Sequence, residues 1–267
     1  MTGRRLALPG VLAAVSIACL STVAGCQMAG TCGWIATHGN FWWPSAYGPP
    51  LLIVLATALA YTLRLGLMTW RATRELARLP RVPVPPNLVR NAQSAGIARI
   101  ACVGARSPVA FCAGLLRPTV FVSEGAVAVL AEPELLAVLH HEADHARRHE
   151  PVRRAARNAA ADVLTFLPVV GWWSERQIAR SELSADAAAE RVVGRSALAG
   201  ALLVMTAPAI PLAAFVGHAE LRARRLLGMG IDEPKPPRAV WAATFVYSWL
   251  ALSLTGCLFE AGAALVT

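Results

Sequence analysis

The residues best suited to chemistry lie in the sequence LLAVLHHEADHARRHE, positions 135–150, which holds four of the chain's six histidines. His141 and His145 are four residues apart, so on a helix they lie on one face, one turn from each other. Two such imidazoles can bind one zinc ion, and Glu142 beside the first can take a proton from a water molecule that zinc activates. This H-E-x-x-H pattern is the signature of zinc peptidases, and it predicts Zn²⁺ as cofactor and Glu142 as catalytic base.

Zinc requires a third protein ligand, and the polar residues nearby are poorly placed to supply it. His149 lies eight residues after His141, a rise of about 12 Å on a helix, whereas two ligands of one zinc ion lie only about 4 Å apart. His140 and Asp144 point roughly 100° away from an adjacent ligand, which suits the surface or a supporting hydrogen bond. We therefore expect the third ligand to come from another part of the chain.

The sequence ARSELSADAAAERVVG, residues 179–194, predicts a helix with two acids four residues apart on one face, Glu182 and Asp186. Alone, such a pair is typical of a solvated acidic face. Downstream of H-E-x-x-H it is the best candidate to complete the site. We expect Glu182 to bind the metal and Asp186 to hydrogen-bond a ligand imidazole.

Three short β-like runs precede the histidine-containing helix, separated by Gly, Pro and Ser: residues 98–104, 108–114 and 118–123. A small antiparallel sheet is the simplest interpretation. Ser123 is typical of a helix N-cap, and Pro133 of the first residue of a helix. That helix is expected to include all of the sequence ELLAVLHHEADHARRHE.

The composition indicates a membrane protein, because 56% of the 267 residues are hydrophobic and the mean hydropathy is +0.50. No charged side chain occurs between Arg5 and Arg64. Three segments are long and apolar enough to cross a lipid bilayer, at residues 6–25, 51–70 and 240–259.

The arginines predict the topology. Residues 71–158 hold thirteen arginines and the loop at 27–50 holds no charge, so the former is expected in the cytoplasm and the latter outside. The net charge of +9 would also suit nucleic acid, but arginines marking the cytoplasmic side explain it better, and no direct nucleic-acid binding is expected. We expect a multi-pass protein of the bacterial plasma membrane with its site on the cytoplasmic side.

Two further apolar stretches have less certain roles. Residues 159–173 are short for a span and could be re-entrant, interfacial or part of the core. Residues 196–216 are long enough to span, but the basic sequence ELRARRLLGMG follows them, which favours a packed helix pair at the membrane surface.

The cysteines show no metal-binding spacing. The sequence VAGC ending at Cys26 is similar to a lipoprotein cleavage box, although an uncleaved first span is favoured. Cys26 and Cys32 could form a disulfide bond outside the cell or remain thiols. The others are expected to be packing residues: Cys19, Cys102, Cys112 and Cys257.

The sequence SPVAFCAGLLRPTVFVSEGAVAVLAEPELLAVLHHEADHARRHEP, followed by SELSAD, resembles the BlaR/MecR family of membrane metallopeptidases. It is more distantly similar to HtpX-type and CAAX prenyl proteases. The resemblance covers about residues 98–193. It implies a zincin-like core at the cytoplasmic membrane face with Glu182 as third zinc ligand. It also implies that Ala110, Phe111 and Cys112 form an edge strand to which an extended substrate adds.

The chain departs from the best-known members, which sense β-lactams through an external penicillin-binding domain. The sequence ends just after the third expected span, and its only lysine, Lys235, has Asp232 three residues before it, so no S-x-x-K motif is present. Acylation by a β-lactam through that motif is therefore not expected.

These observations together predict a mainly α integral membrane protein with a zincin-like core, in which transmembrane helices flank a small antiparallel sheet. Residues 1–70 would form two spans, residues 71–238 the cytoplasmic catalytic domain and residues 239–267 the last span. The predicted function is zinc-dependent cleavage of a cytoplasmic or membrane-proximal protein, with a transcriptional repressor as a candidate by analogy. The alternative is a non-catalytic signalling scaffold with a vestigial metal site, against which the intact Glu142 argues.

Overall fold

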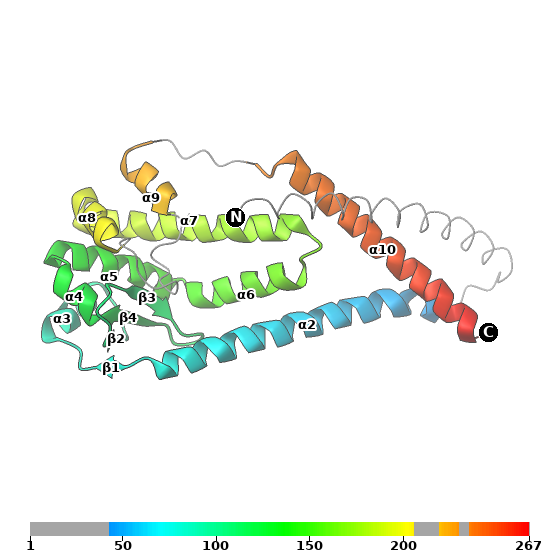
Figure 1. Ribbon diagram of the computed structural model, residues 1–267, viewed down its shortest axis with the longest axis horizontal. Coiled ribbons are helices and arrows are strands. Elements are labelled where there is room, and N and C mark those ends of the chain that lie inside the picture. The colour runs from blue at the N-terminus through cyan, green and yellow to red at the C-terminus, as the bar shows by residue number, and fades with distance from the viewer. Residues whose placement is uncertain (1–42, 206–218, 230–234, 267) are drawn as a thin grey trace. The chain divides into compact units, whose positions relative to one another are not determined.

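The computed structural model describes residues 43–205, 219–229 and 235–266 of the chain (Figure 1). The chain divides into two compact units. Unit 2 consists of Leu63–Asp162 and Gly171–Lys235, and unit 1 contains the rest of the chain. The first expected span, Cys26 and Cys32 lie outside the described residues, so those predictions stay untested.

Unit 2 contains a four-stranded sheet of β1 (Arg81–Val82), β2 (Ile100–Val103), β3 (Ala110–Ala113) and β4 (Thr119–Ser123), in the order β1-β2-β4-β3. The three expected runs form β2, β3 and β4. The prediction of an antiparallel sheet is wrong, because β2 and β4 are parallel and only the other pairs are antiparallel. The reason is that β4 inserts between β2 and β3, which follow one another in sequence. This insertion leaves β3 at one edge of the sheet.

The helices after the sheet begin at the expected residues, with one small shift. Ser123 caps α4 (Glu124–Val129), since its Oγ accepts a hydrogen bond from the Ala126 N–H. Helix α5 (Glu132–Arg147) begins one residue before Pro133. Proline at the second position is still tolerated because N–H groups in the first turn have no partner within the helix.

Helix α5 ends earlier than expected, at Arg147, and α6 (Glu150–Val163) begins three residues later. His149 lies in the turn between them with a φ of 52°. The prediction of one continuous helix through residue 150 is therefore wrong. The left-handed backbone at His149 interrupts the right-handed helical conformation, so α5 cannot continue into α6.

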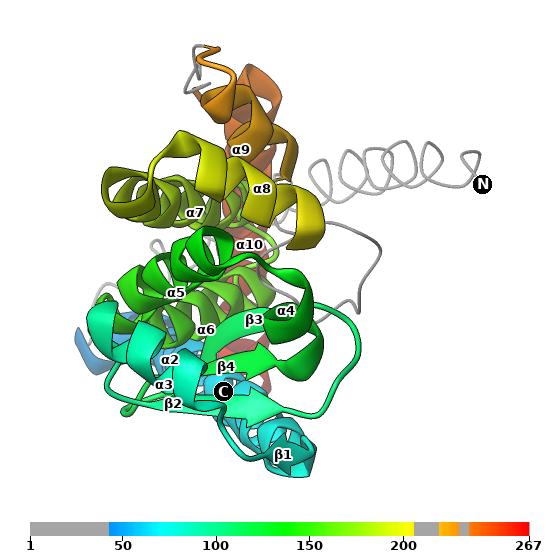
Figure 2. The same ribbon diagram turned by 90° about the vertical axis from the view of Figure 1, so that its left-hand side faces the viewer.

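The hydrophobic core of unit 2 surrounds α5. This helix contacts β3 and β4 on one side and α8 (Arg195–Met205) on another, and α3 (Pro86–Ser94) also packs against it (Figure 2). Leu135, Val138 and Leu139 of α5 are all buried in this core. Burial of each such side chain contributes about 1.5–3 kcal/mol, so the core holds α5 firmly against the sheet.

The two apolar stretches to which the sequence assigned no single role, residues 159–173 and 196–216, are mostly helical where the structure describes them. Residues 159–173 contain the turn between α6 and α7 (Pro168–Val193), so they do not form one spanning helix. Helix α8 covers the start of residues 196–216, and its Leu198, Ala201 and Met205 are buried in the core. Residues 206–218 lie outside the described part of the chain. Beyond them, α9 spans Ala219–Leu226.

Helices α2 (Trp43–Arg78) and α10 (Arg238–Val266) contain the second and third expected spans. Among the described residues, one helical segment, Leu51–Arg78, has the length and apolar composition needed to cross a membrane. Its single charge within the expected span, Arg64, pairs with Asp162 of α6 at 2.6 Å. Spanning by α10, the number of passes and the orientation remain predictions.

Candidate metal centre

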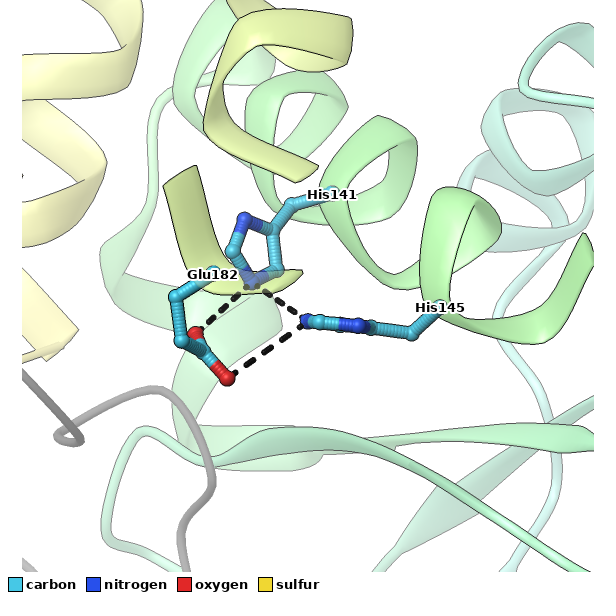
Figure 3. Close-up of side chains that lie close together, drawn as sticks. All are labelled: His141, His145 and Glu182. Atoms are coloured by element: carbon cyan, nitrogen blue, oxygen red, sulfur yellow. Dashed lines mark hydrogen bonds and ion pairs between the residues drawn. The ribbon is translucent and has the colours of Figure 1, made fainter. Parts of the chain in front are cut away.

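Helices α5 and α7 bring two histidines and one glutamate together in the interior of unit 2 (Figure 3). The Nε2 atoms of His141 and His145 are 3.1 Å apart. Glu182 faces both rings, with Oε2 3.5 Å from Nε2 of His141 and Oε1 3.8 Å from Nε2 of His145. The structure thus assembles the expected set.

The spacing of this cluster fits a single metal ion. One ligand atom from each residue lies within 4.8 Å of the others, and all three residues are buried. Ligands at about 2.0–2.2 Å from one zinc ion lie about 4 Å or less apart, so small side-chain movements suffice. Two imidazoles and a carboxylate are also a donor set that zinc prefers in catalytic sites.

The other candidates on the same stretch lie apart from the cluster. His149 is exposed in the turn after α5 and lies outside the cluster of His141, His145 and Glu182. Its distance from His141 is not the rise of one continuous helix, because α5 ends before it at Arg147. Asp144 forms ion pairs with Arg147 and Arg148. His140 is half-buried and is absent from the cluster.

Glu142 is a buried carboxylate whose oxygen atoms have no hydrogen-bond partner among the described residues. Its exposed fraction is 1%. Burial, reinforced by the nearby charge of Glu182, raises the pKa of Glu142 to about 7. A buried carboxylate without a partner is costly, so these free oxygens fit a polar group or an ion that enters the site.

Asp186 accepts a hydrogen bond from the ring of His141, as expected, at 2.9 Å between Oδ1 and Nδ1. This bond leaves Nε2 of His141 directed at His145 and Glu182. Burial alone would raise the pKa of Asp186, but hydrogen bonds from His141 and Arg222 outweigh it and hold the pKa at about 2. Asp186 therefore stays a carboxylate that fixes the orientation of this imidazole.

Arg222, which the sequence analysis missed, lies behind Asp186. This arginine of α9 is fully buried, and its Nε and Nη2 donate to the two oxygens of Asp186 at 2.7 and 2.5 Å. Its Nη1 is also 3.8 Å from Oε2 of Glu182. In the sequence, Arg222 is one of three arginines in ELRARRLLGMG, and nothing distinguishes it from its exposed neighbour Arg224.

Arg154 of α6 is a second missed residue. Its Nη2 donates to Oε1 of Glu182 at 2.8 Å, so arginines approach this carboxylate from two helices. Burial would raise the pKa of Glu182, but the hydrogen bond from His141 and the surrounding positive charges lower it to about 2. Glu182 is therefore ionised and able to bind a cation at neutral pH.

The expected edge strand runs beside the cluster. Strand β3 holds Ala110, Phe111 and Cys112 at the edge of the sheet and contacts α5. Cys112 lines a small cavity of about 50 Å³ together with Glu142 and His145. Burial and the charge of Glu142 raise the pKa of the Cys112 thiol to about 12, so it remains protonated.

The family model described as Peptidase family M48 matches residues 87–217, a range that contains the whole metal cluster. No curated protein matches the chain. The finer BlaR/MecR resemblance stays a prediction. Residues 87–217 are thus similar to peptidase family M48, and they hold an intact, buried His-His-Glu metal site of the kind that a metallopeptidase uses.

Proposed function

We propose that this metallopeptidase is a membrane-anchored zinc endopeptidase that cuts a cytoplasmic or membrane-proximal protein. The observation that supports this most is the buried, unpartnered carboxylate of Glu142 beside the cluster of His141, His145 and Glu182. A purely structural metal site has no use for such a carboxylate, which argues against the scaffold alternative. Zinc, when bound, supplies Lewis acidity toward a peptide carbonyl and activation of water.

Glu142 acts as the general base in this proposal. Its side chain receives the proton of the attacking water and can pass it to the amine that leaves. Its raised pKa, about 7, is near the range in which a base accepts and returns a proton readily. The buried position also keeps bulk water away from the reacting groups.

Asp186 and Arg222 position His141. The guanidinium of Arg222 donates hydrogen bonds to both carboxylate oxygens of Asp186. Asp186 in turn accepts a hydrogen bond from Nδ1 of His141. With a metal ion bound, this hydrogen bond would hold the imidazole in the tautomer that carries its proton on Nδ1 and leaves Nε2 for the ion.

The substrate is proposed to bind as an added strand along β3. This strand is a sheet edge, and its Cys112 faces the same cavity as Glu142. Main-chain hydrogen bonds along Ala110–Ala113 would hold an extended peptide largely independently of its sequence. A folded substrate would have to present a flexible segment to bind in this way.

The cellular setting is proposed from the sequence. The order of motifs supports a BlaR/MecR-type enzyme in the bacterial plasma membrane, with spans near residues 6–25, 51–70 and 240–259 and the site on the cytoplasmic side. Cleavage of a transcriptional repressor would fit this setting by analogy. The apolar segment Leu51–Arg78 supports membrane anchoring.

Removal and return of the metal test this function. The full chain, purified in detergent, is expected to contain about one zinc ion and to cut unstructured proteins such as casein. A chelator should abolish cleavage, and one equivalent of zinc should restore it. Cleavage that persists after the chain is shown to be free of metal would contradict the proposal.

A further inference from the structure

A groove beside β3 has no role in the metal centre. Its volume is about 330 Å³, within the range of about 300–1,000 Å³ typical of small-molecule sites. Three elements of unit 2 form its walls. Helix α2 contributes Met68, Ala72 and Leu76, strand β3 contributes Phe111, and α6 contributes Ala155.

The groove adjoins the small cavity that Glu142 lines, because the two share lining residues. Cys112, Pro151 and Arg154 line both, and Glu142 and His145 line the smaller one. Side chains of an extended peptide alternate between its two faces. A peptide that lies along β3 with one bond at Glu142 therefore has a nearby side chain directed toward the groove.

The groove lining suits an apolar side chain. No carboxylate lines it among the described residues, so a lysine or arginine side chain would lose hydration without gaining a counter-charge. Its one charged lining residue, Arg154, already donates to Glu182 at 2.8 Å. Contact with Met68, Leu76 and Phe111 favours a large hydrophobic group, at about 25 cal/mol for each Å² removed from water.

We propose that this groove is the specificity pocket for a large apolar side chain adjacent to the bond that is cut. This inference rests on the proposed function and names the substrate class, a segment with leucine, phenylalanine or methionine beside the cut bond. The α2 wall belongs to the candidate membrane segment Leu51–Arg78. Because α2 would enter the membrane, a substrate segment that binds in this groove would lie near the membrane surface.

Ala72→Phe tests the groove, because the added ring would occupy space along the α2 wall. Ala77→Phe is its matched control, since both alanines are exposed on α2 and only Ala72 lines the groove. A randomised peptide library first identifies the position beside the cut at which wild type prefers large apolar residues. Two peptides with leucine or alanine at that position then give kcat/KM for each variant.

Ala72→Phe is expected to lower kcat/KM for the leucine peptide by about 10- to 200-fold, the usual value of a pocket contact. The alanine peptide should change less than about twofold, and Ala77→Phe should resemble wild type on both peptides. Leu76→Ala enlarges the groove and should shift the preference toward tryptophan. Zinc content equal to that of wild type shows that each variant retains its site.

Two results would overturn the inference: a wild type that shows no preference for large apolar residues, or an unchanged preference in both Ala72→Phe and Leu76→Ala. An equal loss on both peptides, together with altered binding of a spin-labelled fatty acid, would assign the groove to a lipid chain instead. A zinc-loaded wild type that cuts no peptide in the library would refute the proposed function itself, and the groove proposal with it.

Discussion

The substitution Arg222→Met removes a guanidinium that is 0% exposed and keeps an unbranched apolar side chain in its place. Asp186 then loses two hydrogen bonds, those from Nε and Nη2 at 2.7 and 2.5 Å, while its carboxylate stays buried. Removing one partner of a buried ion pair typically costs about 3–5 kcal/mol. Since domains are stable by only about 5–15 kcal/mol, the metal-free variant should unfold at a much lower denaturant concentration.

Metal affinity should also fall, because Asp186 would no longer be held in one orientation toward His141. Loss of such a supporting contact typically weakens metal binding about 10- to 100-fold. Zinc affinity is measured by competition with a chromophoric chelator, and unfolding by denaturant titration of the chelated protein. The assay thus separates the effect on the site from the effect on the fold.

Arg224→Met on the same helix is the control. Arg224 has a side chain 57% exposed and pairs with Glu220 at 2.8 Å, a surface pair worth at most about 1 kcal/mol. The double variant Arg222→Met, Asp186→Asn should recover part of the lost stability, because it removes the uncompensated charge. Changes in zinc affinity and stability that are no larger for Arg222→Met than for Arg224→Met would contradict this role of Arg222.

The remaining predictions concern the ligands, the core and the topology. Glu182→Ala should lose most of its zinc and Asp186→Ala should bind zinc about 10- to 100-fold more weakly, whereas His149→Ala should bind it normally, as measured by metal analysis and chelator competition. Leu139→Ala should lower the free energy of unfolding by about 2–5 kcal/mol because it opens a cavity under α5, and a loss below about 1 kcal/mol would contradict the core described here. A cysteine at the exposed position Arg90 should react with a membrane-impermeant thiol reagent only after cells are permeabilised, and labelling of intact cells would place the catalytic unit outside.

The local parts of the site were predictable because their causes are local. The four-residue spacing of His141 and His145 places both imidazoles on one helical face in any helix. Glu182 could be predicted as the third ligand because Asp186 lies one turn later on the same face of the same helix. The first residues of α5 and α4 followed from Pro133 and Ser123 to within one residue.

The parts that depend on tertiary structure could not be predicted in the same way. Alternation of apolar residues identifies β2, β3 and β4 but not their neighbours, so the insertion of β4 was missed. The end of α5 was missed because His149, a residue without glycine's freedom, adopts a positive φ. Arg222 was missed because its role depends on the packing of α9 near α7, and no local pattern marks it.

Glu142→Gln tests the central claim most directly, because it keeps the side-chain shape and all three proposed ligands and removes only the base. The purified variant and wild type should each contain about one zinc ion per chain, and cleavage by the variant should be slower by about 10²- to 10⁴-fold. A zinc-loaded Glu142→Gln chain that cuts the same substrate at the wild-type rate would contradict the assignment of Glu142 as the catalytic base.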